Sequence, residues 1–176
     1  MSNTPSTPAG QVLIEGEHAT LSFQRQLRHP PEAVWEALTD PAQLRQWFMM
    51  VAKIDGRPGG KVEMVTGPAR FEWRGDILAW EPPRLYEYEW NVDAREELPQ
   101  GEQSVVRWEL TPRDGGTLLT LTHRRLTRGT ALGFAPGTHA FLDRLEAHLA
   151  KEQLPDWMRR YQEVQGSYPA WRPPHR

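Results

Sequence analysis

The sequence predicts an α+β domain in which a curved antiparallel sheet is covered by one long helix near the C-terminus. Apolar and polar residues alternate in several short segments between residues 18 and 126. Turn signals rich in proline and glycine separate these segments. After residue 137, apolar residues recur at helical spacing instead. A chain of 176 residues is long enough to form one such domain without disulfides or metals.

The first elements are a strand and two short helices. Residues 18–27 alternate and are expected to form a strand. Pro31 then falls in the first turn of a helix whose apolar side includes Trp35. Asp40 precedes another proline and is expected to cap a second short helix that carries Trp47.

Five further strands are expected after these helices. They are predicted at residues 61–66, 71–80, 85–90, 104–110 and 117–126. The turns between them include Gly67-Pro68, Glu81–Arg84 and Asp114–Gly116, because proline cannot continue a ladder and Asp-Gly favours a hairpin. Residues 91–103 are expected to form a long polar loop.

Two helices are expected at the end of the chain. After a glycine-rich connection, Phe141, Leu145 and Leu149 mark the apolar stripe of the long helix. Asp156 is expected to cap a last helix, in which Trp157 and Tyr161 anchor it to the body of the protein.

This pattern divides the chain into three parts. Residues 1–16 are expected to be a flexible N-terminal tail, residues 17–154 the domain, and residues 155–176 a C-terminal helical extension and tail. The N-terminus lacks the basic start and apolar run of a signal peptide, and no segment is apolar enough for membrane insertion. A cytoplasmic location is therefore expected. Exposed sheet edges would allow a homodimer.

Composition limits the chemistry that this chain can perform. The 21 basic and 23 acidic residues give a net charge of −2, which argues against a nucleic-acid partner. The absence of cysteine excludes disulfides, thiolate metal sites and a cysteine nucleophile. The histidines show no metal-ligand spacing, so no metal is expected, and no phosphate-binding glycine motif indicates a cofactor. Eight tryptophans are the unusual feature.

The alternation predicts that large aromatic rings gather on one face of the sheet. Tyr86, Tyr88 and Trp90 share a face, and Glu87 and Glu89 point the other way. The other strands repeat this division between an apolar and a charged face. The rings either fill the space beneath the long helix or leave an apolar cavity there, and we favour a cavity because so many wide side chains are hard to interdigitate on a concave surface.

The order of elements and several motifs resemble the helix-grip superfamily of START, birch-pollen-allergen and polyketide-cyclase proteins (SRPBCC). Within it, the chain is most similar to the family of homologues of the activator of the heat-shock protein 90 ATPase. The resemblance spans about residues 19–149 and is carried by residues 31–48, the Gly59-Gly60 turn, residues 75–90 with their Glu-Pro-Pro turn, and residues 116–123. It implies a strand, two helices, six strands and a long helix enclosing a hydrophobic cavity. It does not imply chaperone activation, because the Trp-His-Trp motif of eukaryotic activators is absent.

Together these observations predict a binding protein for a small apolar or aromatic ligand, whose identity the sequence does not give. The expected ligand-binding residues are Met64, Phe71, Trp73, Tyr86, Tyr88, Trp90, Trp108, His123, Phe141 and Leu145. The hydroxyl groups of Tyr86 and Tyr88, together with His123, would fix ligand orientation by hydrogen bonding. His139 and Asp143 are four residues apart and are interpreted as an ordinary surface or helix-end contact.

Two alternatives remain open at this stage. One is a stress-related chaperone accessory or interaction module, which would need an exposed apolar patch and a chaperone partner. The other is a cyclase-, aromatase- or hydrolase-like enzyme that uses His123 as its acid or base, although no catalytic residue is identified.

Overall fold

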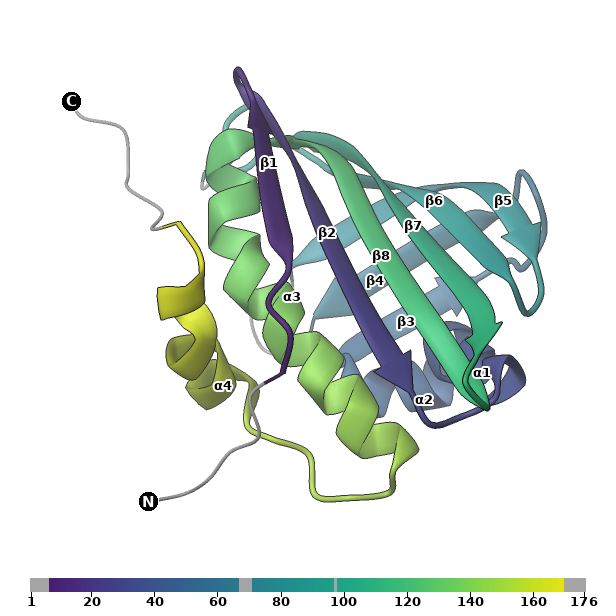
Figure 1. Cartoon of the computed structure of the whole chain (residues 1–176). Helices are drawn as coiled ribbons and strands as arrows, with labels where there is room; N and C mark the ends of the chain where they lie inside the picture. Colours follow the sequence, from purple (N-terminus) through teal and green to yellow (C-terminus); the bar gives the residue numbers. More distant parts are fainter. Residues whose placement is uncertain (1–6, 67–70, 97, 170–176) are drawn as a thin grey trace.

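The computed structural model describes residues 7–66, 71–96 and 98–169, and in them eight antiparallel strands form one curved sheet (Figure 1). The strands are β1 (Gln11–Glu15), β2 (His18–Leu27), β3 (Met50–Ile54), β4 (Lys61–Thr66), β5 (Glu72–Glu81), β6 (Leu85–Val92), β7 (Glu102–Arg113) and β8 (Gly116–Thr127). Their order across the sheet is β1-β2-β8-β7-β6-β5-β4-β3. The helices are α1 (Pro31–Thr39), α2 (Pro41–Trp47), α3 (Arg128–Leu149) and α4 (Trp157–Val164), followed by the short 3₁₀ helix η1 (Gln165–Ser167).

This architecture confirms the predicted α+β helix-grip fold. From β2 to α3, the chain runs through a strand, two helices, six strands and a long helix, and α3 lies across the concave face of the sheet (Figure 1). The predicted caps form as well. Asp40 accepts a hydrogen bond from the backbone N–H of Ala42 at the start of α2, and Asp156 accepts one from Arg159 at the start of α4.

The predicted N-terminal tail is wrong for residues 11–15, which form strand β1. This strand pairs with β2 along its whole length, from Gln11 opposite Ser22 to Glu15 opposite His18. Its three central residues are all apolar and do not alternate, so the period of two that reveals a half-buried strand is missing. The outer parts of both predicted tails, residues 1–6 and 170–176, lie outside the described residues, as does the predicted Gly67-Pro68 turn.

Two other segments are more regular than their composition predicts. The polar loop expected at residues 91–103 is shorter, because β6 continues to Val92 and β7 begins at Glu102. The glycine-rich connection expected before residue 138 is the first half of α3, with Pro136 inside the helix. Buried Glu102 holds the start of this helix, since its carboxylate accepts hydrogen bonds from the backbone N–H of Thr127 at 2.6 Å and from the Thr130 hydroxyl at 3.0 Å.

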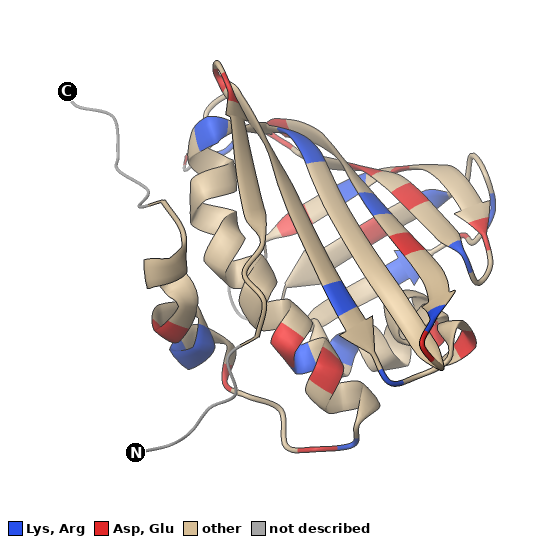
Figure 2. Cartoon of the chain, in the orientation of Figure 1, with Lys and Arg blue, Asp and Glu red and all other residues tan. Residues whose placement is uncertain are grey.

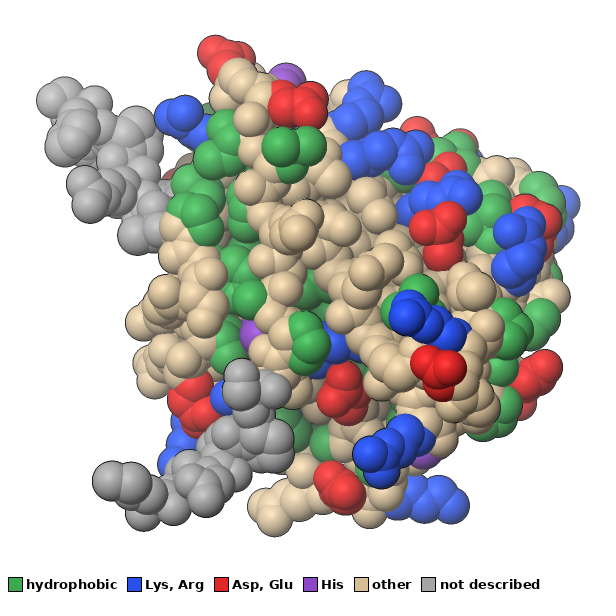
Figure 3. Space-filling view, in the orientation of Figure 1, with side chains coloured by type: hydrophobic (Ala, Val, Ile, Leu, Met, Phe, Trp, Pro, Cys, Tyr) green, Lys and Arg blue, Asp and Glu red, His purple; other side chains and the backbone are tan. Residues whose placement is uncertain are grey.

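The two faces of the sheet differ as the alternation predicts. On the outer face, the Glu87 carboxylate accepts hydrogen bonds from Arg107 at 3.2 Å and from Arg124 at 2.9 Å, within a charged band across neighbouring strands (Figure 2). Figure 3 shows charged side chains spread over this outer surface, with hydrophobic side chains gathered where β1 runs beside α3. The inner face supplies most of the hydrophobic core.

A β-bulge changes the face to which Trp80 belongs. The register between β5 and β6 shifts between Ile77 and Ala79, so that Trp80 lies opposite inward-facing Tyr86. Trp80 packs edge-on against Tyr86 at 5.1 Å and against Trp35 of α1 at 5.0 Å between ring centroids. Strict alternation along this strand places Trp80 out of phase with the inner face, and the bulge corrects that expectation.

Candidate ligand-binding cavity

A cavity of about 750 Å³ lies between the inner face of the sheet and α3. Strands β4 to β8 form its floor, α3 covers it, and residues of α2, α4 and the α2–β3 connection complete its wall. The lining residues are Trp47, Phe48, Met49, Met50, Thr66, Phe71, Trp73, Tyr88, Trp90, Val106, Trp108, Leu121, His123, Gly133, Phe134, Gly137, Thr138, Phe141, Leu142, Trp157, Met158 and Tyr161. Met49 and Met158 are exposed, so the cavity reaches the surface beside them.

The wall is aromatic and uncharged. Of the 22 described residues that line it, 11 are Phe, Trp or Tyr, and none is Asp, Glu, Lys or Arg. The rings contact one another in stacked and edge-on pairs. The ring centroids of the stacked pair Trp73 and Tyr88 are 5.3 Å apart, and those of the edge-on pair Trp90 and Phe134 are 5.4 Å apart. This packing fixes the orientation of the rings that line the cavity.

Seven of the ten residues predicted from the sequence line this cavity: Phe71, Trp73, Tyr88, Trp90, Trp108, His123 and Phe141. The other three, Met64, Tyr86 and Leu145, are fully buried in the surrounding core instead. Their phase on a strand or helix predicts that they point inward, which they do. The phase does not say which helix covers each residue. Tyr86, for example, lies under α1, where its ring centroid is 6.0 Å from that of Trp35.

Tyr86 is buried without a hydrogen-bond partner for its hydroxyl group among the described residues. Burial raises the pKa of this phenol well above its usual value, and the neighbouring Tyr88 adds to the shift. The hydroxyl therefore stays protonated. Because Tyr86 lies outside the cavity wall, it supplies no polar contact there.

Helix α4 forms part of the cavity wall, although its sequence predicts only an anchor to the body of the protein. The anchoring itself is confirmed. The Trp157 indole donates to the carbonyl of Gly137 at 3.1 Å, and the Tyr161 hydroxyl donates to that of Gly133 at 2.9 Å. A methyl group at Gly137 would come within 3.0 Å of the Trp157 ring, so glycine permits this close approach. The four-residue spacing of the two aromatic residues gives the anchored face but not the cavity behind it.

The few polar atoms of the cavity floor are held by neighbouring strands. Tyr88, Val106 and His123 lie opposite one another in a row across β6, β7 and β8. The Tyr88 hydroxyl accepts a hydrogen bond from the Trp108 indole at 3.2 Å. His123 Nε2 lies 2.7 Å from the Ser104 hydroxyl, and burial lowers the pKa of His123 to about 3. The imidazole is therefore neutral near pH 7.

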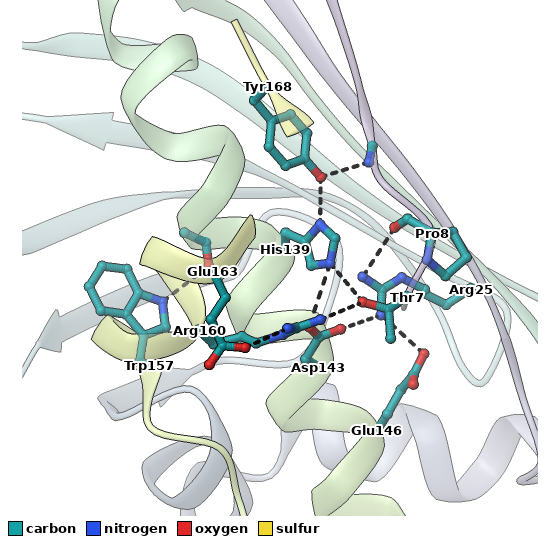
Figure 4. A network of polar contacts seen from close by, with 12 residues as sticks. Thr7, Pro8, Arg25, His139, Asp143, Glu146, Trp157, Arg160, Glu163 and Tyr168 are labelled. Atoms are coloured by element: carbon teal, nitrogen blue, oxygen red, sulfur yellow. Dashed lines mark hydrogen bonds and ion pairs between the residues drawn. The ribbon is translucent and has the colours of Figure 1, made fainter. Parts of the chain in front are cut away.

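On the opposite side of α3, a buried polar network attaches α4 and the N-terminal segment to the sheet (Figure 4). Asp143 of α3 is its centre. Its carboxylate lies 2.8 Å from Arg25 Nη1 of β2 and 2.6 Å from Arg160 Nε of α4. Burial raises the pKa of Asp143, but the hydrogen bonds and charges of the two guanidinium groups together outweigh burial, and the net shift is downward. Asp143 therefore stays ionised and links three elements.

The interpretation of His139 and Asp143 as a surface contact is wrong, because both side chains are buried in this network. His139 Nε2 lies 3.5 Å from the Asp143 carboxylate and 2.7 Å from the Thr7 hydroxyl. Its Nδ1 lies 2.7 Å from the Tyr168 hydroxyl (Figure 4). Burial lowers the pKa of His139 to about 4, although Asp143 opposes the shift. Neither residue lines the cavity.

Among the residues that the structure describes, no helix has the length and apolar character needed to span a bilayer.

Comparison with known proteins agrees with this helix-grip fold. A model of the family described as "Activator of Hsp90 ATPase homolog 1-like protein" matches residues 28–150. The chain belongs to this family, which is one of the SRPBCC families. Helix α4 lies beyond the matched residues. No curated protein matches the chain.

Several solved structures are similar over most of the chain. Protein MLL2253 from Mesorhizobium loti is 28% identical, with a TM-score of 0.68, and the alignment covers 77% of this chain and 99% of that one. CalU16 from Micromonospora echinospora is 27% identical, with a TM-score of 0.67 and coverage of 91% and 92%. The protein encoded by BPP1335 from Bordetella parapertussis is 27% identical, with a TM-score of 0.68 and coverage of 93% and 92%.

Proposed function

We propose that this protein binds a small apolar or aromatic molecule in the cavity between the sheet and α3. The observation that carries the proposal is a cavity of about 750 Å³ whose wall is half aromatic and has no charged residue among those described. Cavities of roughly 300–1,000 Å³ with mainly apolar walls and a few polar groups are typical of small-molecule sites. We further propose that the protein is cytoplasmic and binds this ligand without a metal or cofactor.

The cavity favours ligand binding over the two alternatives. A chaperone accessory would offer its apolar surface to a partner, whereas these rings line a recess between the sheet and α3 that opens beside Met49 and Met158. The family name supports the hypothesis that the partner is heat-shock protein 90. Measuring whether the purified chain stimulates the ATPase activity of that chaperone would test this hypothesis. An enzyme would need a proton-transfer group, and His123, with a pKa of about 3, is unprotonated at pH 7 and only a weak base.

A cavity-filling variant tests the proposal. Gly133 lines the cavity, and a methyl group added there would meet no heavy atom within 4 Å apart from its own helix. The Cβ atom of Gly133→Leu therefore fits without a clash, and the rest of its isobutyl group should occupy space in the cavity. Gly129→Leu is a matched control, since it makes the same change at an exposed position of α3.

The measurement is a titration with N-phenyl-1-naphthylamine, an uncharged probe whose fluorescence rises in apolar surroundings. The unchanged chain and Gly129→Leu should bind the probe saturably, and Gly133→Leu should bind it at least tenfold more weakly. The absence of saturable binding to the unchanged chain, or equal affinity in all three proteins, would contradict a ligand site in this cavity.

A further inference from the structure

The hydrogen bonds around Ser104 determine which nitrogen of His123 carries the proton. The Ser104 hydroxyl is buried, donates to the carbonyl oxygen of Trp90 at 2.9 Å, and lies 2.7 Å from His123 Nε2. A serine hydroxyl has one hydrogen. Because that hydrogen is used on the carbonyl, both short contacts are hydrogen bonds only when His123 Nε2–H donates to the serine oxygen. The neutral ring then carries its lone pair on Nδ1.

Nδ1 of His123 is therefore a hydrogen-bond acceptor that needs a donor. It makes no hydrogen bond with any of the residues that the structure describes. Among those residues, the fully enclosed side-chain atoms without a partner are Arg25 Nε and the Tyr86 hydroxyl oxygen, so Nδ1 is not fully enclosed. His123 lines the cavity, so the space that Nδ1 can reach is the cavity itself. A donor on a bound molecule would satisfy it without displacing any protein contact.

The rest of the wall limits the charge of that molecule. No lining residue among those described is Asp, Glu, Lys or Arg, and the Arg95 guanidinium lies over Phe71, away from His123. A carboxylate or ammonium group on the floor beside His123 would therefore lose its hydration without a charged lining side chain to compensate it. The Tyr88 hydroxyl already accepts the Trp108 N–H and has its own hydrogen left to donate. Thr66 and Thr138 are half-buried lining residues that water can reach.

We propose that the cavity takes an uncharged aromatic molecule with a hydrogen-bond donor, such as a phenolic hydroxyl, which donates to Nδ1 of His123. This inference rests on the proposed function and narrows the class of ligand. The aromatic wall recognises the ring system, and the row from Tyr88 to His123 offers one donor and one acceptor across three strands. Backbones two strands apart in a sheet are separated by about 10 Å, a span suited to a molecule of two or three fused rings.

Two probes of nearly equal shape test the role of the donor. 2-Naphthol carries a hydroxyl group where 2-methylnaphthalene carries a methyl group, and both are uncharged at pH 7. Each is titrated into the full chain while tryptophan fluorescence is recorded. One net hydrogen bond corresponds to about a fivefold change in affinity, so 2-naphthol should bind about fivefold more tightly although it is the less apolar probe. In His123→Phe, which keeps a ring but removes the acceptor, this preference should disappear.

Nitrogen-15 spectra of the unchanged protein provide a test that does not depend on a variant. The His123 ring should show a protonated Nε2 and an unprotonated Nδ1, and the Nδ1 resonance should shift when 2-naphthol is added but not when 2-methylnaphthalene is added. Equal or reversed probe affinities in the unchanged protein, or a proton on Nδ1, would overturn this inference and leave the proposed function standing. Failure of both probes to bind would overturn both.

Discussion

Two buried neutral histidines should make this protein lose stability between pH 7 and pH 5. Burial lowers the pKa of His123 to about 3, and burial, partly opposed by Asp143, lowers that of His139 to about 4. In the unfolded chain, both imidazoles bind protons below about pH 6.5. The unfolded state therefore binds more protons than the folded state throughout this window, and the free energy of unfolding falls as the pH falls.

The magnitude follows from the same values. At pH 5 the unfolded form of each histidine gains about 2 kcal/mol from protonation, and the folded forms gain almost nothing. The two residues together should lower the free energy of unfolding by about 4 kcal/mol, a large part of the 5–15 kcal/mol typical of a domain. Asp143, whose pKa is lowered, has the same sign but acts only as the pH falls further through the acidic range, where its carboxylate becomes protonated.

Urea unfolding followed by tryptophan fluorescence at pH 7 and pH 5 measures this loss. The variant His123→Phe should lose about 2 kcal/mol less between the two pH values, because one of the two strongly shifted imidazoles is gone. Burial also lowers the pKa of His148, which contributes with the same sign in both proteins. A free energy of unfolding that is unchanged or higher at pH 5, or an equal loss in the variant, would refute the assignment of two neutral buried imidazoles.

Three further predictions concern α3 and α4. Gly133→Ala should raise the melting temperature, since alanine stabilises a helix interior by about 1 kcal/mol relative to glycine and the added methyl group meets open space. Gly137→Ala should raise the melting temperature less or lower it, because its methyl group would lie 3.0 Å from the Trp157 ring. Arg160→Met should lower the free energy of unfolding by about 2–4 kcal/mol in urea melts, because buried Asp143 loses a counter-ion; a loss below about 0.5 kcal/mol would contradict the network. Trp157→Ala should weaken N-phenyl-1-naphthylamine binding by about tenfold through the loss of a wall ring, and unchanged affinity would remove α4 from the site.

The sequence was sufficient to predict the faces of regular strand segments, because alternation is a local property, but not the inward position of Trp80, which follows from the bulge in β5. Trp73, Tyr88, Trp90 and Trp108 are each in phase with their neighbours, and all four line the cavity. Tyr86 is equally in phase, but it lies beneath α1 rather than α3. The helix that covers a given stretch of strand is determined by tertiary packing. The periodicity of one strand therefore does not predict it.

Other features needed information from distant parts of the chain. Strand β1 is defined by its pairing with β2, which an apolar run without alternation does not indicate. The glycines in the first half of α3 have a low intrinsic helix propensity. The helix forms nevertheless, because Glu102 accepts a hydrogen bond at its first turn and α4 donates hydrogen bonds to the carbonyls of Gly133 and Gly137. The buried setting of His139 likewise depends on Thr7 and Tyr168, which are far from it in sequence.

The tryptophan indole N–H signals offer the most direct test of the central claim, that an aromatic molecule binds between the sheet and α3. Five of the seven tryptophans in the described part of the chain line the cavity: Trp47, Trp73, Trp90, Trp108 and Trp157. Trp35 and Trp80 pack against each other outside it and act as internal controls. When 2-naphthol is added to nitrogen-15-labelled protein, the signals of Trp73, Trp90 and Trp108 on the floor should shift saturably while those of Trp35 and Trp80 stay in place. Shifts confined to Trp35 and Trp80, or no saturable shift in the floor residues, would contradict the assignment of this cavity as the ligand site.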